Sequence, residues 1–348
     1  IQKLVKNRIY EVEIFNFVIS LVEYGNESKT IQSDVLTSGV NSERGAAVYT
    51  LMDFSFNKDK HKVILNKIKE ISPNSDPSVR ACALIKLANF LKYSREDTFE
   101  TFKLLISDYS IGLVKLSPQL LAYSQKAEFI DLKNFYSKAI LIPEASEAMG
   151  QLLTRFYCFN YEGADKLMDD FINQNEENAE PVINIAWKFI QSHVKGDLNN
   201  EIIRAITLIH KFLDTDNSKV ASSYRFPFYH LEVHHFSILK EFLFEYVDST
   251  VGKYREDSFY LYLAKCTKEF PEECISLASK FENHIDFNTK DRVLRNEPLN
   301  VIISAYNQIR EYDKSDSAIE NAMDVFDGIL KNSKLRDSAF DVLEKLEY

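Results

Sequence analysis

The chain has 348 residues, a formal net charge of −10 and a hydrophobic content of 45%. This length allows two or three compact domains or one extended repeat array, and this apolar content excludes a generally disordered chain. Residues 175–348 carry 21 Lys and Arg against 30 Asp and Glu. We therefore do not expect a dedicated nucleic-acid binder, because clustered basic residues supply most of the affinity for phosphates.

Apolar residues recur at helical spacing from the first residue onward. Residues 1–22 already show this pattern and begin without an initiator methionine, so we expect a piece of a longer protein. The stretch HKVILNKIKEI places four apolar residues on one face of a helix: Val63, Ile64, Ile68 and Ile71. The same spacing predicts further helices over residues 81–91, 99–106, 147–157, 164–172, 182–190, 202–213, 236–247, 259–266, 299–309 and 318–330. Alternating strand patterns with hairpin turns are missing from the sequence, so the expected fold is all-α.

Cap residues and first-turn prolines mark where some of these helices begin. Ser75 and Asp76 precede Pro77 at one start, and Phe270 precedes Pro271 at another. Because the breaks between helical segments are short, consecutive helices should pack as antiparallel hairpins.

Two segments near the start of the chain look like copies of one repeat. Arg44 and Arg80 lie 36 residues apart, and each is followed by small residues and then an apolar helix. Small residues let neighbouring helices approach closely, and the D-x-x-V-R-x-x-A core that starts at Asp76 resembles a HEAT repeat. We expect one elongated HEAT/TPR-like α-solenoid of antiparallel helix hairpins along the whole chain. Its repeats should be clearest in residues 1–110 and more irregular in residues 111–348.

The cysteines and apolar runs are typical of a cytoplasmic protein. None of the four cysteines is part of a Cys-x-x-Cys pair, and all four fall within helical patterns, which is typical of buried free thiols in a reducing compartment. They are Cys82, Cys158, Cys266 and Cys274. No signal peptide opens the chain, and charges interrupt each apolar run before the roughly 18 residues that a membrane span needs. We expect no membrane partner.

Three histidines fall within the run FPFYHLEVHHF, which raises the question of a zinc site. Zincins use His-Glu-x-x-His, in which the glutamate follows the first histidine directly. Here Glu232 comes two residues after His230, roughly 200° around a helix and away from the face that His230 and His234 would share. We therefore expect a helix that starts after Pro227, with apolar residues and imidazoles packed between helices, and no metal ligands.

Phosphate-binding and catalytic motifs are missing from the sequence. The one Gly-Lys pair, at Gly252, has no glycine five residues before it and continues to tyrosine, so it is not a P-loop. Paired carboxylates such as Asp169 and Asp170 are typical of solvated helix faces. We expect no catalytic residues and no cofactor in this chain.

Aromatic residues concentrate between Tyr224 and Phe236 more densely than helical spacing can bury. Tyrosine and arginine are enriched at the energetic centres of protein–protein interfaces, although core packing accounts for many of these side chains. The predicted partner-binding residues are Tyr224, Arg225, Phe228, Tyr229, His230 and His234.

The order of these features resembles the C-terminal region of large bacterial STAND-type NTPases, the NLR-like antiphage proteins called Avs. The matching segments are N-S-x-R-G-x-A-x-x-x-L at residues 41–51, the repeat at residues 76–83, the string ASSYRFPFYHL and the PEEC helix start at residues 271–274. The repeat at residues 76–83 is one residue shorter, between its serine and its valine, than the corresponding repeat of that family.

This resemblance implies that an effector and an NTPase lie upstream of this chain and that oligomerisation uses that upstream region. The chain itself would be a C-terminal, non-catalytic sensor that recognises a protein ligand such as a phage structural or packaging protein. A generic HEAT-like scaffold that binds host proteins is the alternative. A helical-repeat DNA glycosylase is a third possibility, against which the acidic second half argues.

Overall fold

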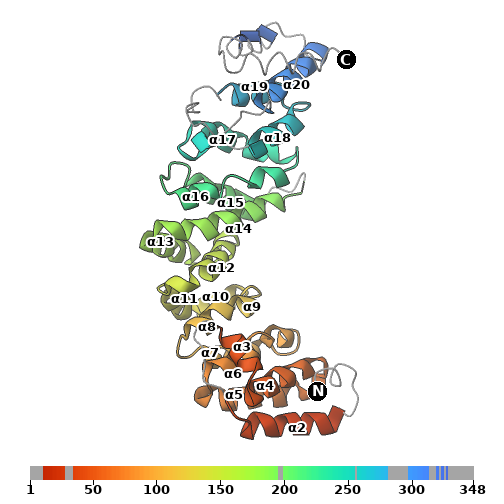
Figure 1. Cartoon of the computed structure of the whole chain (residues 1–348), viewed down its shortest axis with the longest axis vertical. Coiled ribbons are helices and arrows are strands. Elements are labelled where there is room, and N and C mark those ends of the chain that lie inside the picture. The colour runs from red at the N-terminus through yellow and green to blue at the C-terminus, as the bar shows by residue number, and fades with distance from the viewer. Residues whose placement is uncertain are drawn as a thin grey trace. The chain divides into compact units, whose positions relative to one another are not determined.

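The computed structural model describes residues 11–27, 34–194, 199–254, 257–280 and 297–312, together with residues 319–320, 323–324 and 327. Within these residues the regular elements are all helices and no strand occurs (Figure 1), which confirms the all-α prediction for the described part. The chain divides into two compact units, residues 1–174 and 175–348. The expectation of one continuous repeat domain stays a prediction.

The first unit consists of short helices joined by 3-10 turns. Its α-helices are α2 (Glu11–Tyr24), α3 (Val35–Val40), α4 (Glu43–Asp53), α5 (His61–Ile71), α6 (Pro77–Leu84), α7 (Arg95–Leu105), α8 (Ile111–Leu116), α9 (Pro118–Leu121), α10 (Lys126–Asp131), α11 (Lys133–Ala139), α12 (Ser146–Cys158) and α13 (Ala164–Gln174). Its 3-10 turns are η1 (Phe54–Phe56), η2 (Lys58–Lys60), η3 (Ser72–Asn74), η4 (Leu87–Phe90) and η5 (Pro143–Ala145). The helix predicted over residues 81–91 starts earlier, at Pro77, and is divided between α6 and η4.

The second unit is built in the same way. Its α-helices are α14 (Ala179–Gln191), α15 (Asn200–His210), α16 (Ser218–Ser222), α17 (His235–Asp248), α18 (Asp257–Cys266), α19 (Pro271–Ser279) and α20 (Glu297–Tyr312). Its 3-10 turns are η6 (Glu176–Asn178), η7 (Pro227–His230) and η8 (Val251–Tyr254). Two predictions fall outside the described residues. One is the start of the opening helical pattern, residues 1–10, and the other is the helix predicted over residues 318–330, of which only a few positions are described.

Side-chain caps form where two helices of the first unit begin, one of them at the predicted residue Asp76. Asp76 is the N-cap of α6, and its Oδ1 accepts a hydrogen bond from the backbone N–H of Ser78 at 2.9 Å. Ser42 is the N-cap of α4, and its Oγ accepts one from the N–H of Gly45 at 3.0 Å. Each cap satisfies one backbone donor that the first turn leaves unpaired.

One face of α5 was predicted incompletely. Ile64 and Ile68 are buried as expected, but Val63 is 51% exposed and Leu65 takes the place assigned to it. Val63 is five positions before Ile68, which places it roughly 140° around the helix from the buried face.

Small residues bring α3, α4 and α6 close together. Gly39 of α3 lies against α6, where an added Cβ would come within 2.1 Å of the carbonyl oxygen of Ser78 and 2.6 Å of the Sγ of Cys82. Ala81 and Ala47 are buried on the facing helices. The expectation that small residues allow close helix packing is confirmed here.

Helices contact the next helix but one along the first unit, in addition to sequential neighbours. Such contacts join α4 to α6, α6 to α8 and α5 to α7. On one side, Lys69 of α5 binds Asp97 and Glu100 of α7 at 2.9 and 2.8 Å, and Lys103 of α7 binds Asp131 of α10. The residues in these ion pairs are 28 to 31 positions apart.

The same relation recurs in the second unit, where α15 contacts α17 and α17 contacts α19. His210 of α15 lies 3.0 Å from a carboxylate oxygen of Glu245 on α17, and Lys240 of α17 binds Glu273 of α19 at 2.8 Å. The second pair spans 33 positions. In both units, charged side chains therefore connect helices about one helical hairpin apart.

Candidate functional site

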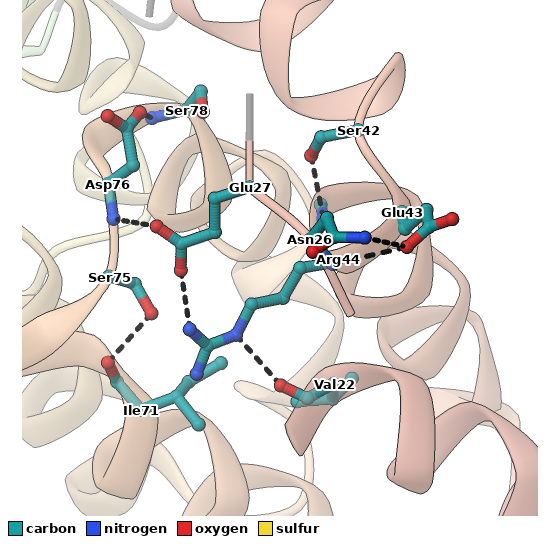
Figure 2. A network of polar contacts seen from close by, with 11 residues as sticks. Val22, Asn26, Glu27, Ser42, Glu43, Arg44, Ile71, Ser75, Asp76 and Ser78 are labelled. Carbon is teal, nitrogen blue, oxygen red and sulfur yellow. Dashed lines mark hydrogen bonds and ion pairs between the residues drawn. The ribbon is translucent and has the colours of Figure 1, made fainter. Parts of the chain in front are cut away.

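Arg44 is the centre of a polar network at the start of the first unit (Figure 2). Its Nε donates to the carbonyl oxygen of Val22 at 2.8 Å, and its Nη1 donates to Oε1 of Glu27 at 2.5 Å. The second oxygen of Glu27 accepts the backbone N–H of Asp76, the N-cap of α6, at 3.1 Å. One carboxylate thus connects the arginine of the first repeat motif to the cap residue of the second (Figure 2).

The loop after α2 is held on the first turn of α4 by further hydrogen bonds. The backbone N–H and the Nδ2 of Asn26 donate to Oε2 of Glu43 at 3.2 and 3.0 Å, and the N–H of Arg44 donates to the carbonyl oxygen of Asn26 at 3.1 Å. Gly25 permits this approach, since a Cβ there would lie 3.1 Å from the backbone nitrogen of Arg44. The network is a structural joint between α2, α4 and α6.

Arg80 makes an equivalent set of contacts in the second motif. Its Nη1 donates to the carbonyl oxygen of Leu105 at 2.9 Å, and its Nη2 donates to the carboxylate of Asp108. Burial would by itself raise the pKa of Asp108, but the hydrogen bond and charge of Arg80 hold it below the usual value. Like Arg44, Arg80 binds a carbonyl at the C-terminal end of a neighbouring helix and a carboxylate just beyond it. Cations are favourable there because the last carbonyls of a helix lack partners.

Two of the predicted partner-binding residues are core residues. Tyr224 and Phe228 are buried, and the Oη of Tyr224 donates to the carbonyl oxygen of Ile209 at 2.5 Å. The ring of Phe228 lies 5.5 Å from that of Trp187 and 5.2 Å from that of Tyr246. Buried side chains do not meet a partner on the folded surface, so these two residues do not belong to a contact surface.

The neighbouring aromatic residues lie on the surface. Phe226 is 59% exposed and Tyr229 is 46% exposed, His230 is exposed, and Arg225 is half-buried. Leu261 of α18 is 43% exposed. We call Phe226, Tyr229, His230 and Leu261 the η7 patch. The predicted set did not include Phe226 or Leu261.

Hydrogen bonds from α18 fix the backbone that carries the η7 patch. Ser258 Oγ donates to the carbonyl oxygen of Arg225, and Lys265 Nζ donates to the carbonyl oxygens of Tyr229 and Leu231 at 3.4 and 3.3 Å. Positions 258, 261 and 265 share one face of α18, because they are three and seven residues apart. The Leu261 side chain therefore lies along the same edge of α18 as these attachments to η7.

The histidines are arranged differently from the prediction. A 3-10 turn ends at His230, residues 231–234 are not helical, and α17 starts at His235. His230 and His234 therefore do not share a helical face, and the helix predicted to start after Pro227 is only the short turn η7. The ring of His234 instead lies 5.7 Å from that of His193 and 4.0 Å from that of His235. His193 is 41 positions from His234, and no local pattern in the sequence could have placed it there.

Burial lowers the pKa of His235, and the neighbouring charges of His234 and His193 lower it further.

Among the residues that the structure describes, no group of three His, Cys, Asp or Glu side chains has the arrangement of a metal site. In the same residues, no helix is long and apolar enough to cross a membrane.

Comparison with known proteins adds no family assignment. No protein-family model matches the chain, and no curated protein matches it.

Proposed function

We propose that the chain is a helical-repeat module of the α-solenoid type that binds a protein ligand through the η7 patch. The observation that supports the repeat architecture is the recurrent connection between a helix and its equivalent one hairpin later. Lys69 with Asp97, and Lys240 with Glu273, make this connection in the two units over 28 and 33 positions. Repeats that contact mainly their neighbours generate extended surfaces, which suit large folded ligands.

The η7 patch has the composition and rigidity of an interface centre. Phe226 and Tyr229 present aromatic surface on a turn whose backbone α18 holds by hydrogen bonds, and Phe228 between them is anchored in the core. A preorganised aromatic surface loses little conformational entropy on binding, so more of its contact energy contributes to affinity. Exposed aromatic residues on such a turn are typical centres of protein recognition.

The wider role that we propose comes from the resemblance to STAND-type defence NTPases. In that setting, the module senses a phage structural or packaging protein and controls an NTPase that lies upstream. The alternative is a scaffold that binds host proteins. The two proposals share the η7 patch and differ in the ligand.

Co-expression of the chain with single phage proteins, followed by affinity purification, tests the ligand. We expect one phage protein to form a stable complex. If none of the terminase, portal and capsid proteins is captured, the result argues against the sensor role. A stoichiometric complex with a host protein in the absence of phage proteins would support the scaffold.

Substitutions in the η7 patch test the surface. Truncating two interface-centre side chains costs about 1 to 2 kcal/mol each, so Phe226→Ala with Tyr229→Ala should raise the Kd at least about tenfold. Ile203→Ala is the matched control, because this exposed side chain lies on α15 of the same unit. It should change the Kd by less than about twofold. Equal effects of the patch and control variants would refute the assignment of the surface.

A further inference from the structure

Three imidazoles meet where the chain beyond α14 contacts the start of α17. Their ring centroids are 4.0 Å apart for His234 and His235, 5.7 Å for His193 and His234, and 5.9 Å for His193 and His235. We call these residues the histidine cluster. The Nε2 of His234 lies 2.9 Å from the carbonyl oxygen of His193 and donates to it.

Burial and the mutual proximity of the three rings favour neutral imidazoles over charged ones, although backbone hydrogen bonds to His235 act in the opposite direction. The backbone N–H of Glu232 lies 2.9 Å from Nδ1 of His235 and donates to it in the tautomer that carries its proton on Nε2, while the carbonyl oxygen of Glu232 lies 3.2 Å from the same nitrogen. The Nδ1 of His193 is buried without a hydrogen-bond partner among the described residues. A positive charge on one ring therefore disfavours a charge on the next, and burial costs each charge part of its hydration.

The surroundings of His235 also disfavour a positive charge. His235 is the first residue of α17, a helix of 14 residues, and a helix N-terminus carries a partial positive charge. His234 and His193 are the titratable side chains whose charge acts on it. Glu232, the carboxylate of the preceding loop, is solvent-exposed, and Lys265 of α18 brings an ammonium group to within 3.3 Å of a carbonyl oxygen of that loop.

The histidine cluster contributes to the contact between α14 and the segment that carries η7. Besides the bond from His234 to His193, Nε2 of Gln191 at the end of α14 donates to the carbonyl oxygen of Pro227 at 3.1 Å. One helical turn earlier, Trp187 packs against Phe228 and other rings of the core. Opening of this contact would expose Trp187 to water.

We propose that the histidine cluster is an acid-sensitive contact, and that its protonation below about pH 6 releases the η7 segment from α14. A group that is harder to protonate in the folded state than in the unfolded chain adds stability above its unfolded pKa of about 6.5, and this stability is lost as the pH falls below that value. The lowered pKa of His235 has this sign. Presentation of the η7 patch would then depend on pH in the mildly acidic range.

Trp187 is the single tryptophan of the chain and serves as the reporter. Emission spectra and acrylamide quenching of the full chain are recorded between pH 7.5 and pH 5.0, with far-UV circular dichroism alongside. We expect a reversible red shift and a severalfold rise in quenching, centred between about pH 5 and pH 6.5, while the helical signal persists. An unchanged tryptophan environment over this range would overturn the proposal.

A combined variant removes the titration and keeps the hydrogen bonds: His193→Gln, His234→Gln and His235→Asn. It should abolish the acid-induced red shift, whereas His210→Gln, the control on α15, should preserve it. Persistence of the shift in a folded combined variant would also overturn the proposal. If the combined variant does not fold, the NMR titration of wild-type His235 decides: it should titrate clearly below about 6.5, and an ordinary midpoint would refute the idea. None of these measurements needs a ligand, so they are independent of the proposed protein binding.

Discussion

Replacement of Arg80 by methionine should destabilise the protein by about 2 to 3 kcal/mol. Arg80 is 5% exposed and donates to the carbonyl oxygen of Leu105 at 2.9 Å. Loss of a charged hydrogen-bond donor to this carbonyl costs about 1.5 to 3 kcal/mol. The ion pair with Asp108 adds up to about 1 kcal/mol, because half of that carboxylate side chain is in water. Methionine retains the aliphatic packing, so no cavity contribution is expected.

Urea unfolding followed by circular dichroism measures this change, with Lys115→Met on the exposed face of α8 as the control. The control should change the free energy of unfolding by less than about 0.5 kcal/mol. Asp108→Asn should cost about 1 kcal/mol or less, because it leaves the bond to Leu105 intact. If Asp108→Asn costs as much as Arg80→Met, the ion pair and not the carbonyl contact is the main interaction, and the reasoning is wrong.

Three further predictions follow from burial and close packing. Phe228→Ala should lower the free energy of unfolding by about 3 to 5 kcal/mol in urea titrations, because it opens a cavity among four aromatic rings; a loss below about 1 kcal/mol would contradict its core position. Burial raises the pKa of Cys82 and of Cys266 to about 12, so both thiols should resist a disulfide reagent at pH 8 until the chain unfolds, and rapid labelling of the native protein would disprove this. Gly39→Ala should lower the thermal midpoint by several degrees in a calorimetric scan, because its Cβ would meet the backbone of α6; an unchanged midpoint would show that α3 can move away without loss.

Local signals in the sequence predicted the helices well. The cap at Asp76 and the proline start at Pro271 are short-range chemistry, and the structure begins helices at these places. The repeat arginines were recognised by spacing, although their partners were not. Val22 and Leu105 contribute only a backbone carbonyl, which leaves no trace in the sequence.

The candidate surface was harder to predict because residue type does not distinguish an exposed aromatic ring from a buried one. With three residues per turn, a 3-10 turn places residues three apart on the same face. Phe226 and Tyr229 are both exposed, and Phe228 and Leu231 are both buried. A period of 3.6 gives the same division, because residues three apart lie only about 60° apart around an α-helix, so helix face and not residue type separates these positions. Contacts across tens of positions, such as that between His193 and His234, need the folded chain.

The carboxylate of Glu27 has a practical consequence for work with shortened chains. A chain that began at residue 34 would keep every helix from α3 onward, yet its first arginine would lose both acceptors that the wild-type protein provides. Such a truncation should lower the melting temperature, and it would also remove the buried α2 residues Phe15, Val18 and Val22. Laboratories that divide the protein for crystallisation should therefore cut upstream of α2.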